Sequence, residues 1–302
     1  MKARTDNTPL HKDDYGLRET PAGDSRGVLN AFTVDFEDWY QGIELPRDSW
    51  DQYEERLELS GGALLDLLKE YKVKATFFVL GHNARRYPHL MKRIVDDGHN
   101  IGSHGDSHEY IYKMTSDEFR DDLARSIESI EKASGVKPIS YRAPFFSITK
   151  DSLWALDDLK DYGIKYDSSM VPVDYYRYGI PDCPRGIHSP TTCEADGSMI
   201  EFPISTAKIL GKTLPISGGT YFRILPYRIV RDRIRKLNNS GKPIIFYIHP
   251  WEIDPDQPRI SLPRRVGIPH YANLAGTLPK LKRLFNDFKF GPMEEVVKLA
   301  TN

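Results

Sequence analysis

The sequence is short of cysteine and has no excess of either charge. Its 302 residues include two cysteines, Cys183 and Cys193, and neither belongs to a CxxC pair. In a reducing compartment this favours two free thiols over a disulfide, and it disfavours a zinc site built from cysteines. The 42 Lys and Arg are balanced by 43 Asp and Glu, and the two signs are interleaved along the chain. This balance leaves no basic surface for nucleic acid or for a membrane.

Long apolar runs are also missing. No run reaches the length that spans a bilayer, and residues 1–27 lack the apolar core of a secretory signal peptide. We therefore expect a cytoplasmic protein without a membrane span. A hydrophobic fraction of 39% in a chain of this length is enough for a large core. We expect a flexible arm at residues 1–28 followed by a single domain at 29–302, and the sequence is compatible with an oligomer.

The sequence does contain a regular alternation of short β-rich runs and amphipathic runs. The β-rich runs predict strands at residues 28–36, 73–80, 99–104, 138–145, 164–170, 199–205 and 242–250. Apolar residues at helical spacing predict helices at 61–71, 89–98, 115–135, 149–163 and 225–241. Residues 252–280 predict a proline-marked loop that leads into a last helix at 278–288. This order predicts an α/β fold with a parallel sheet, either open or closed as a barrel.

The helix at 115–135 has the clearest limits. Thr115 and Glu118 have the spacing of a capping box, and Gly135 can end the helix in a left-handed conformation. The apolar residues between them share one face at helical spacing. This segment therefore predicts a helix that packs one side against the sheet.

Polar side chains stand where the predicted strands end. In chain order they are Asp35, Glu37, Asp38, His104, Arg142, Asp167 and His249. In parallel α/β folds, functional residues gather at the carboxyl ends of the strands. We therefore expect these side chains to meet at one end of the sheet.

The first and third strands end in residues that suit a metal. In "TVDFED", Asp35 and Glu37 share one face of the strand, and Asp38 lies just beyond it. Carboxylates held close together repel one another unless a cation or a proton separates them. His104 and His108 in "SHGDSH" add two imidazoles, and two imidazoles with one carboxylate form a common ligand set for catalytic zinc. Cobalt and nickel also suit this set.

Arg142 and His249 add groups for proton transfer. A guanidinium beside Asp35 would keep that carboxylate ionised and able to accept a proton. His249 follows the apolar strand in "FYIHPWE", and an imidazole moves protons readily near neutral pH. A metal, a carboxylate base and a histidine acid together predict metal-assisted hydrolysis of an acyl group.

Five motifs, "TVDFED", "SHGDSH", "YRAPF", "KYDSS" and "FYIHPWE", occur in this order between residues 30 and 251. In this order the chain resembles the polysaccharide deacetylase family with the NodB homology domain, carbohydrate esterase family four. "SGGTYFRILPY" and the tail are similar to the subgroup from exopolysaccharide and surface-polysaccharide clusters, which implies that 252–302 is a C-terminal extension.

The resemblance implies a distorted (β/α)7 barrel, and an enzyme that uses a divalent metal, most often zinc, to remove N-acetyl groups from amino sugars of a polysaccharide or its precursor. It implies that Asp35 is the base, Arg142 its partner, His249 the acid and His104 and His108 metal ligands. It also implies that Asp167 orients His249, and that Phe145 and Trp251 line the sugar groove.

The first motif departs from the family pattern. The family usually has two adjacent aspartates, the base and then a ligand, whereas here Phe36 follows Asp35. The shared strand face favours Glu37 as the third ligand, and chemical identity favours Asp38, so both stay candidates. The departure also leaves open a cyclic imide or an N-formyl compound as substrate of an amidohydrolase with the same fold. A carbohydrate-binding protein without activity is the remaining alternative, although binding alone needs neither a base nor an acid.

Overall fold

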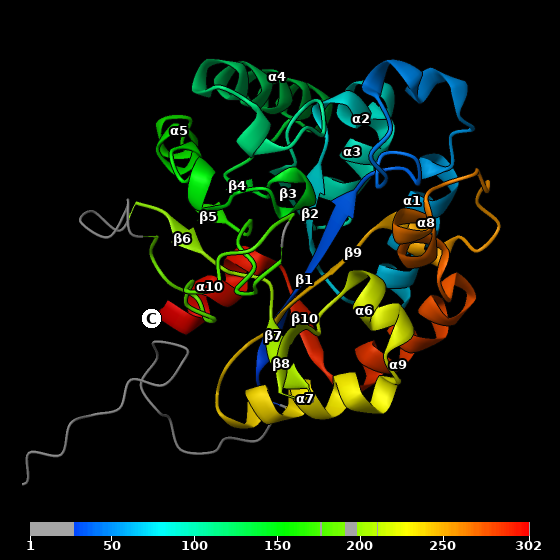
Figure 1. The fold of residues 1–302 in the computed structure, drawn as a ribbon, viewed down its shortest axis with the longest axis vertical. Coiled ribbons are helices and arrows are strands. Elements are labelled where there is room, and N and C mark those ends of the chain that lie inside the picture. The colour runs from blue at the N-terminus through cyan, green and yellow to red at the C-terminus, as the bar shows by residue number, and fades with distance from the viewer. Residues whose placement is uncertain (1–26, 176, 191–197, 210, 302) are drawn as a thin grey trace, which may run out of the picture.

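The structure is a computed structural model that describes residues 27–175, 177–190, 198–209 and 211–301 (Figure 1). Nearly all of the arm predicted at residues 1–28 lies outside the described residues, and so does Cys193. Cys183 is a buried free thiol, as expected for that residue. Among the described helices, none combines the length and the apolar character that crossing a bilayer requires.

Strands and helices alternate through most of the described chain. The strands are β1 Leu29–Phe36, β2 Thr76–Val79, β3 Asn100–Ser103, β4 Ser140–Tyr141, β5 Tyr166–Asp167, β6 Ile200–Glu201, β7 Thr206–Ile209, β8 Lys212–Pro215, β9 Ile245–Ile248 and β10 Lys289–Gly291. The α-helices are α1 Leu57–Glu70, α2 Gly81–Arg86, α3 Pro88–Asp96, α4 Ser116–Ser134, α5 Ala155–Asp161, α6 Gly219–Ile224, α7 Tyr227–Asn239, α8 Arg264–Tyr271, α9 Thr277–Asp287 and α10 Met293–Thr301. Short 3-10 helices are η1 Arg47–Gln52, η2 Ile111–Lys113, η3 Pro144–Phe146, η4 Lys150–Ser152, η6 Pro250–Ile253 and η7 Leu274–Gly276.

The main sheet is parallel and confirms the predicted α/β architecture. Its order is β10-β1-β2-β3-β4-β5-β6, and β9 also pairs with β1. The ladders from β1 to each of β2, β9 and β10, and those from β2 through to β6, are all parallel. The sheet curls into a half-barrel with helices around its outside (Figure 1), which is a distorted (β/α)7 barrel. A separate antiparallel hairpin, β7–β8, precedes α6.

Strand β1 occupies the middle of the sheet and has two different faces. Phe32, Val34 and Phe36 are fully buried in the main apolar core, which helices α1, α3, α7 and α9 complete. The alternate residues Thr33 and Asp35 point to the opposite face, because successive side chains of a strand alternate. The strand thus anchors the core with one face and delivers a carboxylate with the other.

Helix α4 shows how local signals set the limits of an element. Thr115 and Glu118 form the predicted reciprocal capping box, and Gly135 ends the helix with a φ of 77°. Its apolar face, made of Phe119, Leu123, Ile127 and Ile130, is buried. The predicted helix is therefore confirmed at both ends and on its packing face.

The C-terminal tail is more ordered than we predicted. Residues 252–280 are not a simple loop, because helix α8 forms there although Pro269 lies inside it. Partly buried apolar side chains of this segment, including Val266 and Tyr271, pack on a cluster around Trp39 and Trp251, so tertiary packing outweighs the helix-breaking proline. The helix at Leu278 is also not the last, since β10 pairs with the start of β1 and α10 follows it. The tail therefore completes the sheet.

The aromatic cluster on β1 generates the first prediction. Phe32 contacts the rings of Phe246, Phe285 and Phe290, which come from β9, α9 and β10. Phe32→Ala should lower the free energy of unfolding by roughly 3–5 kcal/mol, measured by urea denaturation, because it opens a cavity in a close-packed core. The control Leu299→Ala, at a side chain that is 64% exposed, should change it by less than about 0.5 kcal/mol. Equal effects of the two variants would contradict this account of the core.

Candidate active site

The polar residues at the strand ends meet at one pocket. Asp35 is the second-last residue of β1, and Glu37 directly follows this strand. His104 and His249 directly follow β3 and β9. All four line a pocket of about 380 Å³. The parallel strands bring these carboxyl ends to the same edge of the sheet, as the sequence predicted.

Glu37, His104 and His108 form a buried triad. One ligand atom from each lies within 4.8 Å of the others. Glu37 Oε2 is 2.7 Å from His108 Nε2 and 4.0 Å from His104 Nε2. Nδ1 of His104 is 2.7 Å from the carbonyl oxygen of Arg142, which accepts its proton and leaves Nε2 free to face Glu37. The two predicted histidines therefore meet the acidic cluster.

The triad suits a divalent cation. Burial alone would raise the pKa of Glu37, but His108, His249 and His104 together outweigh it and lower the pKa to about 2. Burial lowers the pKa of His104 to about 4, so this imidazole is neutral. Glu37 Oε2 is buried and has no hydrogen-bond partner of good geometry among the described residues. A buried carboxylate oxygen that faces the ring nitrogens of two histidines is an environment that a metal ion satisfies.

Asp35 is held by Arg142, as predicted. Arg142 Nη1 donates to Asp35 Oδ1 at 2.7 Å and to Thr33 Oγ1 at 2.8 Å. The guanidinium is fully buried, and its Nε and Nη2 donate to the backbone oxygen and the hydroxyl of Ser168. The guanidinium thus holds one oxygen of Asp35 in a charge-assisted hydrogen bond, while the other oxygen, Oδ2, lies 3.8 Å from Nε2 of His249.

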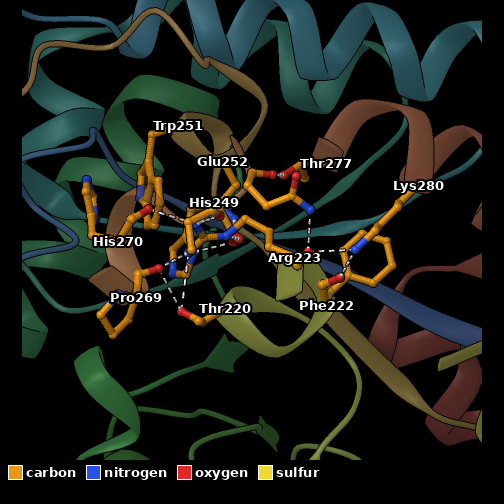
Figure 2. Close-up of polar contacts among 12 residues, drawn as sticks. Thr220, Phe222, Arg223, His249, Trp251, Glu252, Pro269, His270, Thr277 and Lys280 are labelled. Atoms are coloured by element: carbon orange, nitrogen blue, oxygen red, sulfur yellow. Dashed lines mark hydrogen bonds and ion pairs between the residues drawn. The ribbon is translucent and has the colours of Figure 1, made fainter. Parts of the chain in front are cut away.

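His249 lines the same pocket as Asp35 and Glu37. Its Nε2 is 3.8 Å from Asp35 Oδ2 and 3.4 Å from Glu37 Oε1. Its Nδ1 is 2.8 Å from Glu252 Oε1, and Glu252 in turn contacts Arg223 (Figure 2). Burial would lower the pKa of His249, but the surrounding carboxylates Glu37, Glu252 and Asp35 raise it to about 9.

Asp38 does not join the triad, which corrects one of the two candidates for the third ligand. Its Oδ2 accepts the backbone N–H groups of Arg56 and Leu57 at the start of α1, and its Oδ1 accepts that of Trp39. The strand ends at Phe36, so the chain turns and directs Asp38 toward the helix rather than the pocket. The structure thus places Glu37, which shares the strand face of Asp35, beside His104 and His108, and places Asp38 elsewhere.

Asp167 does not contact His249, which corrects its expected role. Its Oδ1 accepts from the hydroxyl of Ser169, and its neighbour is the buried Glu201 on β6. Burial raises the pKa values of both carboxyls. Among the described residues, the Asp167 side chain thus binds Ser169, and His249 is bonded by Glu252 instead. The "DSS" segment supports the other side of the site instead, because Ser168 binds Arg142.

Phe145 and Trp251 both border the pocket, and their role in binding sugar stays a prediction. Phe145 stacks on Tyr110 with ring centroids 4.4 Å apart and contacts His108 at the same centroid distance. Phe145 and His108 have positive φ values of 55° and 58°, a strained conformation that often occurs at functional sites. Trp251 is nearly buried, with its ring stacked between His249 and His270.

Our reading of the sequence missed Glu252 and Arg223. Glu252 stands three residues after His249 in "HPWE", and that spacing places it within reach of the imidazole in the 3-10 turn η6. The sequence therefore carried a signal for Glu252. Arg223 lies in α6, far from His249 in the sequence, and a single sequence carries no signal for their contact.

Two families match consecutive parts of this chain. Residues 59–166 match the family described as Polysaccharide deacetylase, and residues 168–298 match the family described as Domain of unknown function (DUF3473). His104, His108 and Arg142 lie in the first match, while Arg223, His249 and Glu252 lie in the second. The site is therefore built from both.

Individual proteins named as deacetylases are also similar to this chain in sequence or in fold. A peptidoglycan-N-acetylglucosamine deacetylase of Bacillus cereus is 40% identical over 95 residues, which cover 31% of this chain and 34% of that protein. A peptidoglycan deacetylase of Helicobacter pylori is 41% identical over 118 residues, 38% of each. The aligned part thus spans little more than a third of these relatives. The crystal structure of a protein from Mycobacterium smegmatis named as a polysaccharide deacetylase superposes with a TM-score of 0.64 over 94% of this chain and 95% of that one, at 21% identity. It shares the fold.

The geometry separates Glu37 from Asp38 in a metal-binding experiment. Glu37→Gln should weaken zinc binding by more than about 10-fold in calorimetry, because it removes a ligand oxygen. Asp38→Ala should leave zinc affinity unchanged and lower the free energy of unfolding by roughly 1 kcal/mol, because it removes acceptors for N–H groups at the start of α1. The reverse pattern would show that Asp38 is the ligand.

Proposed function

We propose that this chain, whose residues 59–166 match the polysaccharide deacetylase family, is a metal-dependent hydrolase that removes N-acetyl groups from amino sugars of a polysaccharide or its precursor. The observation that carries the proposal is the placement of Asp35 and His249 next to the Glu37–His104–His108 triad, within one pocket. A binding protein would need neither an ionised base nor an acid beside the triad. The named activities of the relatives support the same reaction class.

The residues divide the proton transfers between them. Asp35 is paired with Arg142 through Oδ1, and its Oδ2 accepts a proton from the water that adds to the acyl carbon. When the bond from carbon to nitrogen breaks, Nε2 of His249 gives a proton to the departing amine. Acetate and the free amino sugar are the products, so one water is consumed for each amide bond.

Glu37, His104 and His108 are the residues that would hold the metal. A divalent cation bound there, zinc in the first place with cobalt or nickel as alternatives, would polarise the acyl carbonyl and stabilise its developing negative charge. His104 is kept in the right tautomer for this by the backbone carbonyl of Arg142. Arg142 thus contacts both the base, through its side chain, and a ligand, through its backbone.

The substrate we propose is an N-acetylated glycan of a surface or extracellular polysaccharide, or a precursor of one. The pocket is open and bordered by aromatic side chains, among them Phe145 and Tyr178, which suit the apolar faces of sugar rings. Three expectations stay predictions from the sequence. They are a cytoplasmic location, a possible oligomer, and the division of the chain into an arm and one domain.

Release of acetate tests the proposal. With zinc present, the protein should liberate acetate from an N-acetylglucosamine oligomer, and Asp35→Asn should lower kcat by roughly 100- to 10,000-fold because the base is lost. The control His89→Ala, at an exposed imidazole on α3, should keep its activity. Formate from an N-formylated sugar, or opening of a cyclic imide, in place of acetate would favour the alternative amidohydrolase. Glycan binding without any hydrolysis would favour the binding protein.

A further inference from the structure

We propose that Glu252 and Arg223 are positioning residues for His249, and that the segment matching the domain of unknown function thereby supplies the proton-donating half of the site. The inference rests on the proposed deacetylase function and assigns a role to residues beyond its catalytic groups. It starts from three side chains in a row, the partly exposed His249 and the buried Glu252 and Arg223 (Figure 2).

Glu252 forms hydrogen bonds with both the side chain and the backbone of His249. Oε1 of Glu252 lies 2.8 Å from His249 Nδ1 and accepts the backbone N–H of the same residue at 3.1 Å. The carboxylate therefore fixes both the tautomer and the direction of the ring. With its proton on Nδ1 held by Glu252, His249 presents Nε2 to Asp35 and Glu37, where an exchangeable proton is needed.

Arg223 in turn fixes Glu252. Its Nε donates to Glu252 Oε2 at 2.7 Å, and both side chains are about 1% exposed. The other guanidinium donors are used by neutral groups: Nη1 donates to the carbonyl oxygens of His270 and Ala272, and Nη2 to that of Pro269 and to the Thr220 hydroxyl. Glu252 is thus the anionic partner of Arg223 among the described residues. A guanidinium held on all sides can leave its carboxylate only one orientation.

The backbone is built to bring Arg223 to this place. Gly218 and Gly219 have φ values of 146° and 53°, and a Cβ on Gly218 would lie 2.1 Å from the carbonyl oxygen of Tyr247. Only glycine therefore lets the start of α6 lie directly against β9, which carries His249 at its end. At the other end of α6, Lys280 Nζ donates to the carbonyl oxygens of Phe222, Arg223 and Leu225 (Figure 2).

Stability alone is a poor reason for this arrangement. Taking two charges out of water costs several kcal/mol per ion, and well-packed apolar residues of similar volume are often at least as stabilising. Arg223 and Glu252 are instead joined in series to the imidazole that faces the pocket. The pair therefore acts through His249, in the way that a buried carboxylate orients the histidine of a hydrolase triad.

Two variants and two controls test the inference on the full-length protein. With zinc and an N-acetylglucosamine oligomer, Glu252→Gln should lower kcat by roughly 100-fold and Arg223→Met by roughly 10-fold or more, with KM within about 2-fold of the original. Arg235→Met removes a guanidinium that binds Asp287 away from the pocket, and Glu294→Gln alters a buried carboxyl that binds Thr76, Asn100 and Ser140, also away from the pocket. Both controls should keep kcat within about 2-fold, even where they lower the melting temperature.

A second readout needs no substrate. In protein labelled with ¹⁵N-histidine, the Nδ1–H resonance of His249, identified by its absence from His249→Gln, should be protected from solvent exchange. It should lose that protection in Glu252→Gln and Arg223→Met and keep it in both controls. An unchanged resonance in Arg223→Met, or equal losses of kcat in Arg223→Met and Arg235→Met, would overturn the positioning role. If the original protein releases no acetate, the proposed function fails, and the resonance still decides the positioning role by itself.

Discussion

Two carboxylates buried at the carboxyl end of β1 are the constraint on which the rest of this site depends. Asp35 and Glu37 are each no more than 2% exposed, and neither could stay ionised there without nearby positive charge or strong donors. Arg142 forms an ion pair with Asp35, and Glu37 faces the imidazoles of His104, His108 and His249. The two carboxylates at the end of β1 are thus balanced by side chains from three other parts of the chain, those that follow β3, β4 and β9.

The fold satisfies this need because it is parallel. Strands β1, β3, β4 and β9 all end at the same edge, so residues more than two hundred positions apart lie in one pocket. Each of the two matches carries part of the site, while Asp35 and Glu37 precede residue 59 and lie outside both. The deacetylase match carries the histidine ligands and the guanidinium, and the match of unknown function carries His249 with Glu252 and Arg223. Strand β10 pairs with β1 as well, so the tail is part of the scaffold that holds the base.

Much of this could be predicted from the sequence, for reasons that differ between residues. Asp35, His104, Arg142 and His249 each follow or end an apolar run, and parallel topology then dictates that they meet. Glu37 was separable from Asp38 by strand alternation, a local rule that needs no tertiary information. The contact that we expected between Asp167 and His249 came from the resemblance alone. In this structure β9 pairs with β1, while β5, which carries Asp167, lies between β4 and β6. Arg223 and the helix around Pro269 depend on packing between distant segments, which a single sequence does not encode in any short pattern.

The most direct test of the central claim is anomalous diffraction from crystals grown with zinc. The account predicts one anomalous peak in the pocket, coordinated by an oxygen of Glu37 and by His104 and His108, with Asp35 beside it and still paired to Arg142. A zinc ion bound by Asp38, or one that lies away from both histidines, would contradict it.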